Sequence, residues 1–159
     1  MARRTPDDYA VIRAPFGRVR LRLRAGEIED VDMLSGSLAP RAPRTAAGRR
    51  ACRLLARYFA DPRIPFSAGL LLNGTAFQRR VWRALQRIPS GRVVTYGELA
   101  RHLKTSARAV GNACRANPVP LFVPCHRVVA ANGQGGFMGR RRGAAVALKA
   151  WLLAHERTH

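Results

Sequence analysis

The chain has few acidic residues, and the shortage is greatest in its second half. Residues 73–159 contain 13 Arg and two Lys but only Glu98 and Glu156 as acids, a net charge of +13. Residues 1–72 contain 14 Arg and seven acids, a net charge of +7. Such a field attracts polyanions, so nucleic acid is the expected partner. A GC-rich genome also enriches arginine, but that bias does not explain why acids almost vanish from the second half.

Cysteine and long apolar runs are also scarce. Cys52, Cys114 and Cys125 form no CxxC pair and cannot all be paired within one chain, which argues against a disulfide scaffold and for a reducing compartment. No Cys/His set has zinc spacing, so we expect no metal. No stretch reaches the ~20 apolar residues needed to cross a bilayer. The N-terminus lacks the apolar segment of a signal peptide, so we expect an intracellular, cytoplasmic protein.

The first part of the chain has the pattern of a β-hairpin. Val19, Leu21 and Leu23 alternate with arginines, and this period of two is typical of a half-buried strand. Ala25-Gly26 then turns the chain into a second apolar run, from Ile28 to Leu34. We therefore expect a small sheet near the N-terminus.

A helix is expected after this hairpin, with Ala51 to Phe59 containing its apolar face and Asp61-Pro62 ending it. Leu70 to Leu72 is expected to form a short buried strand. Asn73-Gly74 is a turn and the expected domain boundary. The fold class is therefore α/β (α+β), with a small α/β domain at residues 1–72 and a mainly helical domain at residues 73–159.

The second half is punctuated by helix-start signals. Thr75 to Gln78 and Thr95 to Glu98 both have the spacing of a capping box. After the link Lys104-Thr105-Ser106, another helix is expected from Ala107 to about Ala116. Two short helices with such a link resemble a helix-turn-helix. Many short helix pairs do not bind DNA, but the basic residues around this pair favour a DNA-binding role.

Prolines and glycines shape the segment that follows. Asn117 to Pro120 predicts a stiff extended connector. Leu121-Phe122-Val123 predicts a buried strand that leads into Pro124-Cys125-His126-Arg127. Asn132 to Gly136 is a Gly-rich loop. The last helix is expected from about Ala144 to Glu156, with Leu148, Trp151, Leu152 and His155 along its apolar stripe.

Cys125 is the candidate nucleophile. It lies between a rigid proline and a histidine in a strongly basic segment, and these features favour a thiolate. The alternative is a small buried residue on a strand, and the local sequence leaves both interpretations open. Cys52 and Cys114 are expected to be packing residues of their helices.

His126 and Glu156 are the candidate partners of Cys125. Adjacent residues on a strand point to opposite sides, so contact between Cys125 and His126 requires a bend or a bridging water. A cysteine protease is disfavoured because its histidine lies far from the cysteine in sequence. Glu156 either orients His126 or is an exposed charge at a helix end.

The stretch from Gly74 to Glu156 closely resembles the 6-O-alkylguanine-DNA alkyltransferases, also called methylated-DNA–protein-cysteine methyltransferases. The residues that carry the resemblance are Gly74-Thr75-x-Phe77-Gln78-x-x-Val81-Trp82, Ile88-Pro89-x-Gly91, Thr95-Tyr96, Arg108-Ala109-Val110-Gly111, Asn117-Pro118, Val123-Pro124-Cys125-His126-Arg127-Val128-Val129, Gly135-Gly136-Phe137 and Lys149-x-Trp151-Leu152-Leu153-x-x-Glu156. Residues 1–72 match the family only loosely, through Pro15-Phe16-Gly17, the strands that follow and Tyr58-Phe59.

The resemblance implies DNA repair by direct transfer of an alkyl group from 6-O-alkylguanine in duplex DNA, with 4-O-alkylthymine as a further substrate, to Cys125. His126 would deprotonate the thiol through a water, and Glu156 would hold the imidazole. Tyr96 would donate a hydrogen bond to the departing guanine. The alkylated cysteine is not regenerated, so each molecule acts once and needs no cofactor.

The resemblance also implies minor-groove binding and base flipping. Arg108 would enter the duplex and fill the space left by the flipped nucleotide, because extrusion of a base is costly; a phosphate contact is the alternative for this residue. The other expected DNA contacts are Thr95, Lys104, Ser106 and Arg115. The expected wall of the base pocket is Val123, Gly136, Phe137, Met138 and Gly139. Asn117 would brace the turn before the active-site strand.

The chain departs from the family pattern after Phe137, where about five extra residues, including Arg140, Arg141 and Arg142, precede Lys149. These arginines would reshape the pocket lip or contact phosphates. The expected partner is double-stranded DNA bound by a monomer, with cooperative binding left open. Two other functions are considered: a lesion-binding sensor that transfers nothing, and a small thiol hydrolase that turns over repeatedly.

Overall fold

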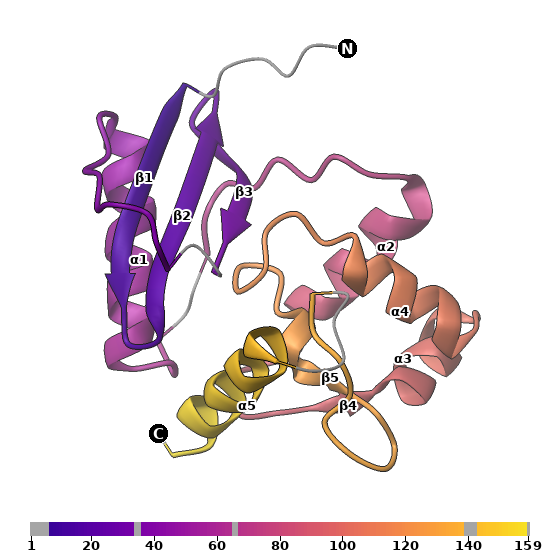
Figure 1. Ribbon diagram of the computed structural model, residues 1–159. Helices are drawn as coiled ribbons and strands as arrows, with labels where there is room; N and C mark the ends of the chain where they lie inside the picture. The colour runs from indigo at the N-terminus through magenta and orange to yellow at the C-terminus, as the bar shows by residue number, and fades with distance from the viewer. Residues whose placement is uncertain (1–6, 34–35, 65–66, 139–142, 159) are drawn as a thin grey trace. The chain divides into compact units, whose positions relative to one another are not determined.

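The computed structural model describes residues 7–33, 36–64, 67–138 and 143–158. The chain divides into two compact units, Met1–Leu72 and Asn73–His159. The first contains a small antiparallel sheet and one helix, and the second is mainly helical (Figure 1). This is the mixed α/β class that the sequence predicted. Gly139 and the inserted Arg140, Arg141 and Arg142 lie outside the described residues.

A three-stranded antiparallel sheet forms most of the first unit, in the order β1 (Asp8–Ala14), β2 (Gly17–Arg24) and β3 (Glu27–Asp32). The alternation predicted for β2 is confirmed: Val19, Leu21 and Leu23 are buried, whereas the intervening arginines are half-buried on the opposite face. The hairpin of β2 and β3 is also confirmed. The strand β1 was missed, because Tyr9 to Ile12 is an apolar run without a clean alternation.

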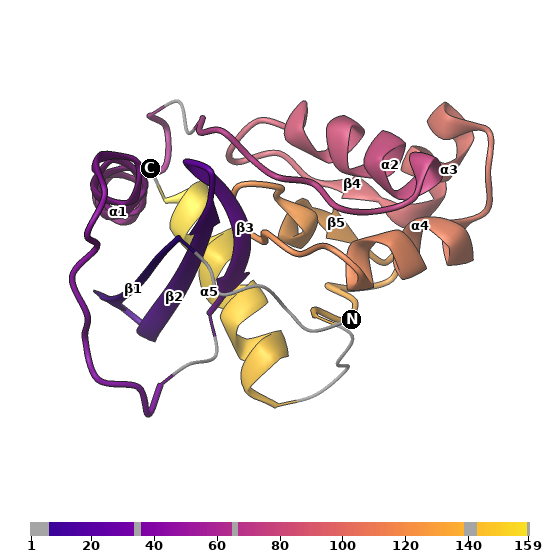
Figure 2. The same ribbon diagram turned by 90° about the horizontal axis from the view of Figure 1, so that it is seen from above.

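Helix α1 (Ala46–Ala60) packs against this sheet (Figures 1 and 2). The predicted helix is confirmed, and Thr45 caps it by accepting a hydrogen bond from the N–H of Gly48. The predicted strand at Leu70 to Leu72 is wrong. Leu70 makes only an isolated bridge to Ile28, and all three leucines are half-buried, so an apolar run alone did not suffice to make a strand.

The second unit begins with α2 (Ala76–Gln86), whose predicted capping box is confirmed. Thr75 accepts from the N–H of Gln78, whose side chain accepts from the N–H of Thr75. Trp82 from this helix is 1% exposed, and its indole N–H donates to the carbonyl of Ala113 over 2.8 Å. This hydrogen bond joins α2 to α4 (Ala107–Arg115) at the centre of the unit's core.

Helix α3 (Tyr96–Leu103) precedes α4, and residues 104–106 link the two. Thr95 caps α3 and Ser106 caps α4. A two-residue strand before α3, β4 (Val94–Thr95), pairs in parallel with β5 (Val128–Val129) (Figure 2). This pairing brings the start of α3 beside the segment that contains Cys125.

The predicted strand at Leu121-Phe122-Val123 is wrong. These residues are buried as expected, but Leu121 has a φ of 76° and the N–H of Val123 bonds the carbonyl of Val119, so the chain turns here. The final helix, α5 (Ala144–Arg157), is confirmed. Its buried stripe contains Lys149 and Glu156 in addition to Leu148 and Leu152, whereas the predicted Trp151 and His155 are half-buried.

Candidate active site

Cys125 begins a single 3₁₀ turn, η1 (Cys125–Arg127), directly before β5. This turn replaces the extended geometry that would send adjacent side chains to opposite sides of a strand. Cys125 is 5% exposed, and its backbone N–H bonds the carbonyl of Val123 over 2.8 Å. A bend, one of the two alternatives that the sequence left open for contact between Cys125 and His126, is therefore present.

Asn117 holds the buried loop that leads to this turn. Its amide nitrogen donates to the carbonyl of Val123 over 2.8 Å, and its side-chain oxygen accepts from the N–H of Val119 over 3.0 Å. The same side chain acts to lower the pKa of the Cys125 thiol. Asn117 thus joins the carbonyl of Val123, which also accepts from the Cys125 N–H, to the N–H of Val119, and so fixes the loop before the turn.

His126, Glu156 and Arg127 form a buried cluster behind Cys125. His126 Nε2 lies 2.7 Å from Glu156 Oε1. The Arg127 guanidinium donates to both carboxylate oxygens of Glu156 and to the carbonyl of Ile88. Glu156 is 4% exposed, so it is a buried partner of the imidazole and not an exposed helix-end charge.

The protonation of this cluster follows from its contacts. Although burial opposes ionisation of Glu156, hydrogen bonds from His126 and Arg127 hold the pKa of Glu156 well below its usual range. Burial lowers the pKa of His126 more than Glu156 raises it, so the imidazole is neutral at pH 7. Because the carboxylate can only accept, we assign the proton to Nε2. The other nitrogen, Nδ1, is buried without a hydrogen-bond partner among the described residues, which leaves its lone pair available as a base.

The electrostatics of Cys125 differ from the expectation that the basic segment favours a thiolate. Burial raises the pKa of the Cys125 thiol above its ordinary value of 9.0, and the Asn117 hydrogen bond and the charge of Lys149 oppose this only in part. Desolvation penalises a charged sulfur locally, whereas surface arginines act through solvent that screens them. The free thiol is therefore protonated at pH 7, and its activation needs a base.

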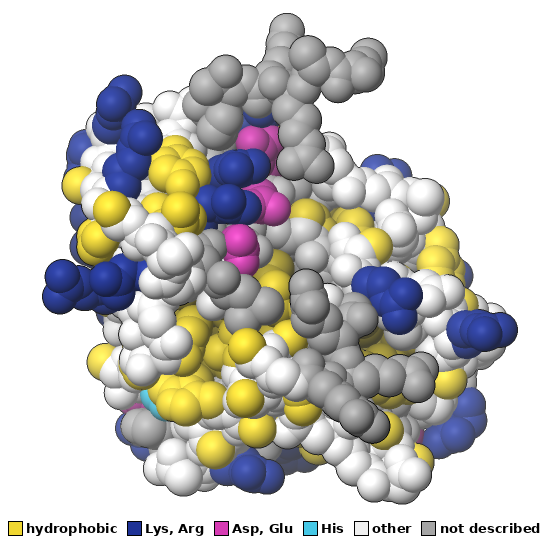
Figure 3. Space-filling view, viewed as in Figure 1, with side chains coloured by type: hydrophobic (Ala, Val, Ile, Leu, Met, Phe, Trp, Pro, Cys, Tyr) yellow, Lys and Arg dark blue, Asp and Glu magenta, His cyan; other side chains and the backbone are white. Residues whose placement is uncertain are grey.

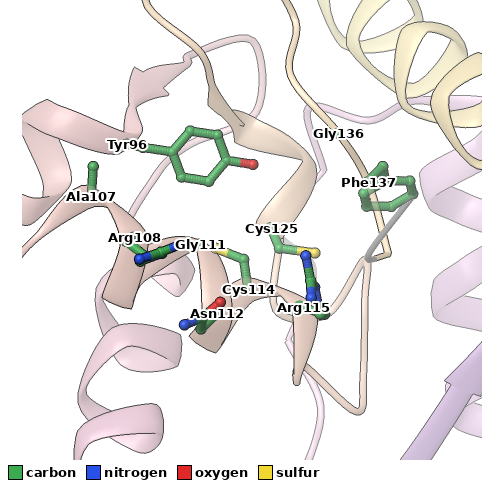
Figure 4. A pocket seen from close by; sticks show the side chains of 10 residues that line it. All are labelled: Tyr96, Ala107, Arg108, Gly111, Asn112, Cys114, Arg115, Cys125, Gly136 and Phe137. Atoms are coloured by element: carbon green, nitrogen blue, oxygen red, sulfur yellow. The ribbon is translucent and has the colours of Figure 1, made fainter. Parts of the chain in front are cut away.

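Cys125 opens onto a pocket of about 560 Å³ (Figure 4). The lining residues are Tyr96, Ala107, Arg108, Gly111, Asn112, Cys114, Arg115, Cys125, Gly136 and Phe137. In Figure 4 the hydroxyl of Tyr96 points toward the Cys125 side of the pocket, and α4 forms the facing wall. Burial raises the pKa of Tyr96 to about 12, so the phenol keeps its proton and can donate a hydrogen bond.

Two of the residues predicted to wall the base pocket, Gly136 and Phe137, line it, but Val123 and Met138 do not. Val123 is fully buried and contributes through its carbonyl, which accepts from Asn117 and from the Cys125 N–H. Met138 is half-buried with a φ of 53°. The fifth predicted residue, Gly139, lies outside the described residues.

The residues predicted to bind DNA lie along α3 and α4. Arg108 and Arg115 are exposed on α4 and also line the pocket. Thr95 and Ser106 are N-caps, and Lys104 is the exposed C-cap of α3. Lys and Arg side chains are spread over the face shown in Figure 3, whereas acidic side chains gather beside the strands β1 to β3. The pocket is thus lined by the first residues of α3 and α4, Tyr96 and Ala107, together with two arginines of α4.

Sequence reasoning missed the roles of Arg127, Lys149 and Cys114. Arg127 stands next to His126 in the motif, but only the fold shows that it shares Glu156 with the histidine. Lys149 is fully buried, and its place between Leu148 and Trp151 in an apolar helix was the available signal. Cys114 is buried as expected but also lines the pocket.

The described residues contain no group of three or more His, Cys, Asp or Glu side chains that could hold a metal ion. Nor does any helix in the described part of the chain have the length and apolar character needed to span a bilayer.

Comparison with known proteins matches residues 76–158 to the family model described as "6-O-methylguanine DNA methyltransferase, DNA binding domain". A methylated-DNA–protein-cysteine methyltransferase of Mycolicibacterium paratuberculosis is 38% identical over 96% of this chain and 93% of its own length. The crystal structure of the Mycobacterium tuberculosis O6-methylguanine methyltransferase has a TM-score of 0.80 at 36% identity, covering 94% of this chain and 92% of its own. A structure of the Mycobacterium tuberculosis protein in complex with DNA has a TM-score of 0.78 at 35% identity, with the same coverage. The chain belongs to the methylated-DNA–protein-cysteine methyltransferase family.

Proposed function

We propose that this chain repairs DNA inside the cell by transferring the alkyl group of 6-O-alkylguanine, and also of 4-O-alkylthymine, to Cys125. One observation carries the proposal: a buried cysteine opens onto a pocket beside a neutral histidine whose Nε2 is held by a buried glutamate. The name of the Mycolicibacterium relative and the DNA complex of the Mycobacterium tuberculosis protein support the same activity and the same partner.

The chemistry begins with the Cys125 thiol, whose raised pKa requires a base. His126 Nδ1 accepts the thiol proton through a water, and Glu156 stabilises the imidazolium that forms. The thiolate attacks the alkyl carbon, a carbon–sulfur bond forms, and the carbon–oxygen bond breaks. Its electron pair stays on the guanine, which regains a proton from His126. The products are unmodified guanine and an S-alkylated cysteine, so each chain acts once without a cofactor.

Tyr96 lowers the barrier at the leaving group. Its phenol is protonated and directed into the pocket, so it can donate a hydrogen bond to guanine as negative charge develops on the ring. A donor placed where charge develops stabilises the transition state more than the ground state. Gly136 and Phe137 wall the space in which the base would sit.

The base reaches this pocket from duplex DNA bound by α3 and α4 acting as a helix-turn-helix in the minor groove. The caps Thr95 and Ser106 place helix N-termini where phosphates can bind, and Lys104 and Arg115 add positive charge. Arg108 lies at the mouth of the pocket and replaces the flipped nucleotide in the stack. Contacts of this kind accept any surrounding sequence, as a lesion scanner needs.

Intact mass after incubation with duplex DNA that contains 6-O-methylguanine tests the proposal. We expect a gain of one methyl group per chain, mapped to the Cys125 peptide and saturating at that value. Cys125→Ser is the control and should bind the same DNA without gaining mass. A protein that binds the lesion without an adduct would be a sensor, and repeated turnover without DNA would indicate a thiol hydrolase; either result overturns the proposal.

The role of Arg108 is tested separately. Arg108→Ala should slow repair in duplex DNA at least about tenfold, because an extruded base costs a few kcal/mol that the arginine helps to offset, yet leave attack on a free 6-O-alkylguanine base nearly unchanged. Arg83→Ala, an exposed arginine of α2 outside the pocket, is the matched control. Equal losses on duplex and free base would contradict the proposed replacement of the nucleotide.

A further inference from the structure

Lys149 is a fully buried lysine that the proposed mechanism does not use. It lies on α5, and its Nζ donates to the carbonyl of Val128 over 2.7 Å and to the carbonyl of Gly136 over 2.9 Å. A buried ammonium is costly unless it is paired or hydrogen-bonded, and a methionine of similar length would fill the same space without that cost. Packing alone therefore does not explain a cation at this position.

The two carbonyls belong to different parts of the site. Val128 begins β5, directly after the turn that contains Cys125, and Gly136 lines the pocket. Lys149 thus joins the nucleophile's segment to the pocket wall through a single side chain. Gly135, next to Gly136, has a φ of 77°, and a side chain at this position would press against Ala130 and the Tyr96 ring, so the loop leaves no room for one.

Several titratable groups face the Lys149 ammonium. It lies 5.8 Å from the centre of the Tyr96 ring on α3, and it interacts electrostatically with Cys114 on α4 and with Cys125 and His126 on η1. Burial lowers the pKa of Lys149 to about 8, so the ammonium still predominates at pH 7. No carboxylate among the described residues forms an ion pair with it. Its ammonium bonds the carbonyl of Val128, three residues after Cys125, and that of Gly136, which lines the same pocket as Cys125. A Cys125 thiolate is therefore an anion that it can balance.

We propose that Lys149 is a positioning residue with two linked effects: its buried ammonium fixes the pocket wall at Gly136 to β5, and its charge stabilises the thiolate of Cys125. The inference rests on the proposed role of Cys125 as the acceptor. Lys149 would then join Cys125, His126 and Glu156 as a fourth residue of the site, and it lies on the same helix as Glu156. Helix α5 thus supplies both the carboxylate behind the base and the positive charge near the sulfur.

Two substitutions separate the charge from the hydrogen bonds. Lys149→Gln removes the charge but keeps an N–H donor for one carbonyl, and Lys149→Met removes both while keeping an unbranched stem. Leu148→Ala, a neighbouring buried residue on α5, is the control for a loss of packing without a change in charge. Thermal unfolding of all variants shows which of them are folded at the assay temperature.

The test is the rate at which a haloacetamide alkylates Cys125 as the pH is raised, followed by mass of the Cys125 peptide. This reaction reports the thiolate directly and does not depend on alkylguanine transfer. An opposite charge nearby typically shifts a pKa by a unit or more, so we expect both Lys149 variants to react about tenfold more slowly at pH 7 and to approach the wild-type rate at high pH. Leu148→Ala should keep the wild-type profile.

Methyl transfer from duplex DNA, measured on the same proteins, tests whether Lys149 holds the pocket wall at Gly136 in place. In Lys149→Met, the rate of methyl transfer should fall by a larger factor than the rate of haloacetamide alkylation at the same pH. In Lys149→Gln, which keeps one hydrogen bond, the rate of methyl transfer should fall less than in Lys149→Met. An unchanged haloacetamide profile in folded Lys149→Gln, or a loss that is uniform at all pH values and shared with Leu148→Ala, would overturn the inference. If the wild type shows the haloacetamide profile but no methyl transfer, the proposed function fails while the charge effect of Lys149 stands.

Discussion

Asp8 and Glu156 are buried carboxylates in different units, and they are held in different ways. Asp8, the first residue of β1, is 3% exposed, and its carboxylate lies against the N-terminus of α1. It accepts hydrogen bonds from the Thr45 hydroxyl and from the N–H groups of Tyr9, Arg44 and Thr45. Glu156 is 4% exposed and accepts from the side chains of His126 and Arg127. Both are satisfied, but only Glu156 has partners that carry, or can gain, a positive charge.

The contrast separates a carboxylate held by backbone groups and a hydroxyl from one held by an imidazole and a guanidinium. Asp8 places a negative charge at a helix N-terminus and binds backbone groups, which is a stable arrangement at any step of a reaction. Glu156 holds an imidazole in one tautomer and can stabilise it as a cation, so its energy changes when a proton moves. Burial alone therefore does not distinguish the two carboxylates, whereas the identity of their hydrogen-bond partners does.

The largest effect on stability is expected for Glu156→Gln. Arg127 would lose its ionic partner while remaining buried, and breaking a buried ion pair typically costs about 3–5 kcal/mol. Chemical denaturation should therefore show a loss of at least about 3 kcal/mol in the free energy of unfolding. A loss below about 1 kcal/mol would mean that Arg127 re-solvates easily and that the pair is not tightly held.

Asp8→Asn should cost less, about 2 kcal/mol, and mainly above pH 4. Burial raises the pKa of Asp8, but hydrogen bonds from Thr45, Arg44 and Tyr9 lower it from 3.8 to about 2. Because the folded pKa is below the unfolded value, this contribution is present above about 3.8 and is lost as the pH falls toward 2. Unfolding curves between pH 2 and 7 should thus converge for wild type and Asp8→Asn at the acidic end; parallel curves would contradict the assignment.

The smallest effect is expected for Arg20→Gln in the first unit. Arg20 bonds Asp30 at 3.3 Å with side chains 22% and 37% exposed, and such half-exposed pairs contribute about 0–1 kcal/mol. The free energy of unfolding should change by less than about 1 kcal/mol, and less at high salt. A loss as large as that of Glu156→Gln would show that the sheet depends on its surface ion pairs.

Local patterns in the sequence predicted most of the helices and the strand β2. Thr75 capping α2, the alternation of Val19, Leu21 and Leu23, and the helix at α5 all follow from residues close in sequence. The strand β1 and the turn at Leu121 could not be predicted in this way. The strand β1 depends on its pairing with β2, and the turn depends on a positive φ at Leu121, which nothing about an apolar residue predicts.

The candidate site, too, could be predicted only in part from the sequence. Cys125, His126, Glu156 and Tyr96 could be named from the motif and its resemblance, and the structure brings Cys125 and Tyr96 to one pocket and His126 and Glu156 into contact. The raised pKa of Cys125 was not foreseen, because formal charge counted along the sequence says nothing about local desolvation. Arg127 and Lys149 were missed for the related reason that arginine and lysine are read as surface residues by default.

Whether Glu156 acts with Cys125 in the transfer can be measured by the single-turnover rate of methyl transfer from duplex DNA. The rate is compared in wild type, Asp8→Asn and Glu156→Gln under conditions where all three are folded. Asp8→Asn should transfer its methyl group at the wild-type rate. Glu156→Gln should be slower by about a hundredfold or more, because the base loses the group that stabilises its protonated form. A Glu156→Gln protein as fast as wild type, or an Asp8→Asn protein equally slow, would contradict the assignment of Glu156 to the chemistry of Cys125.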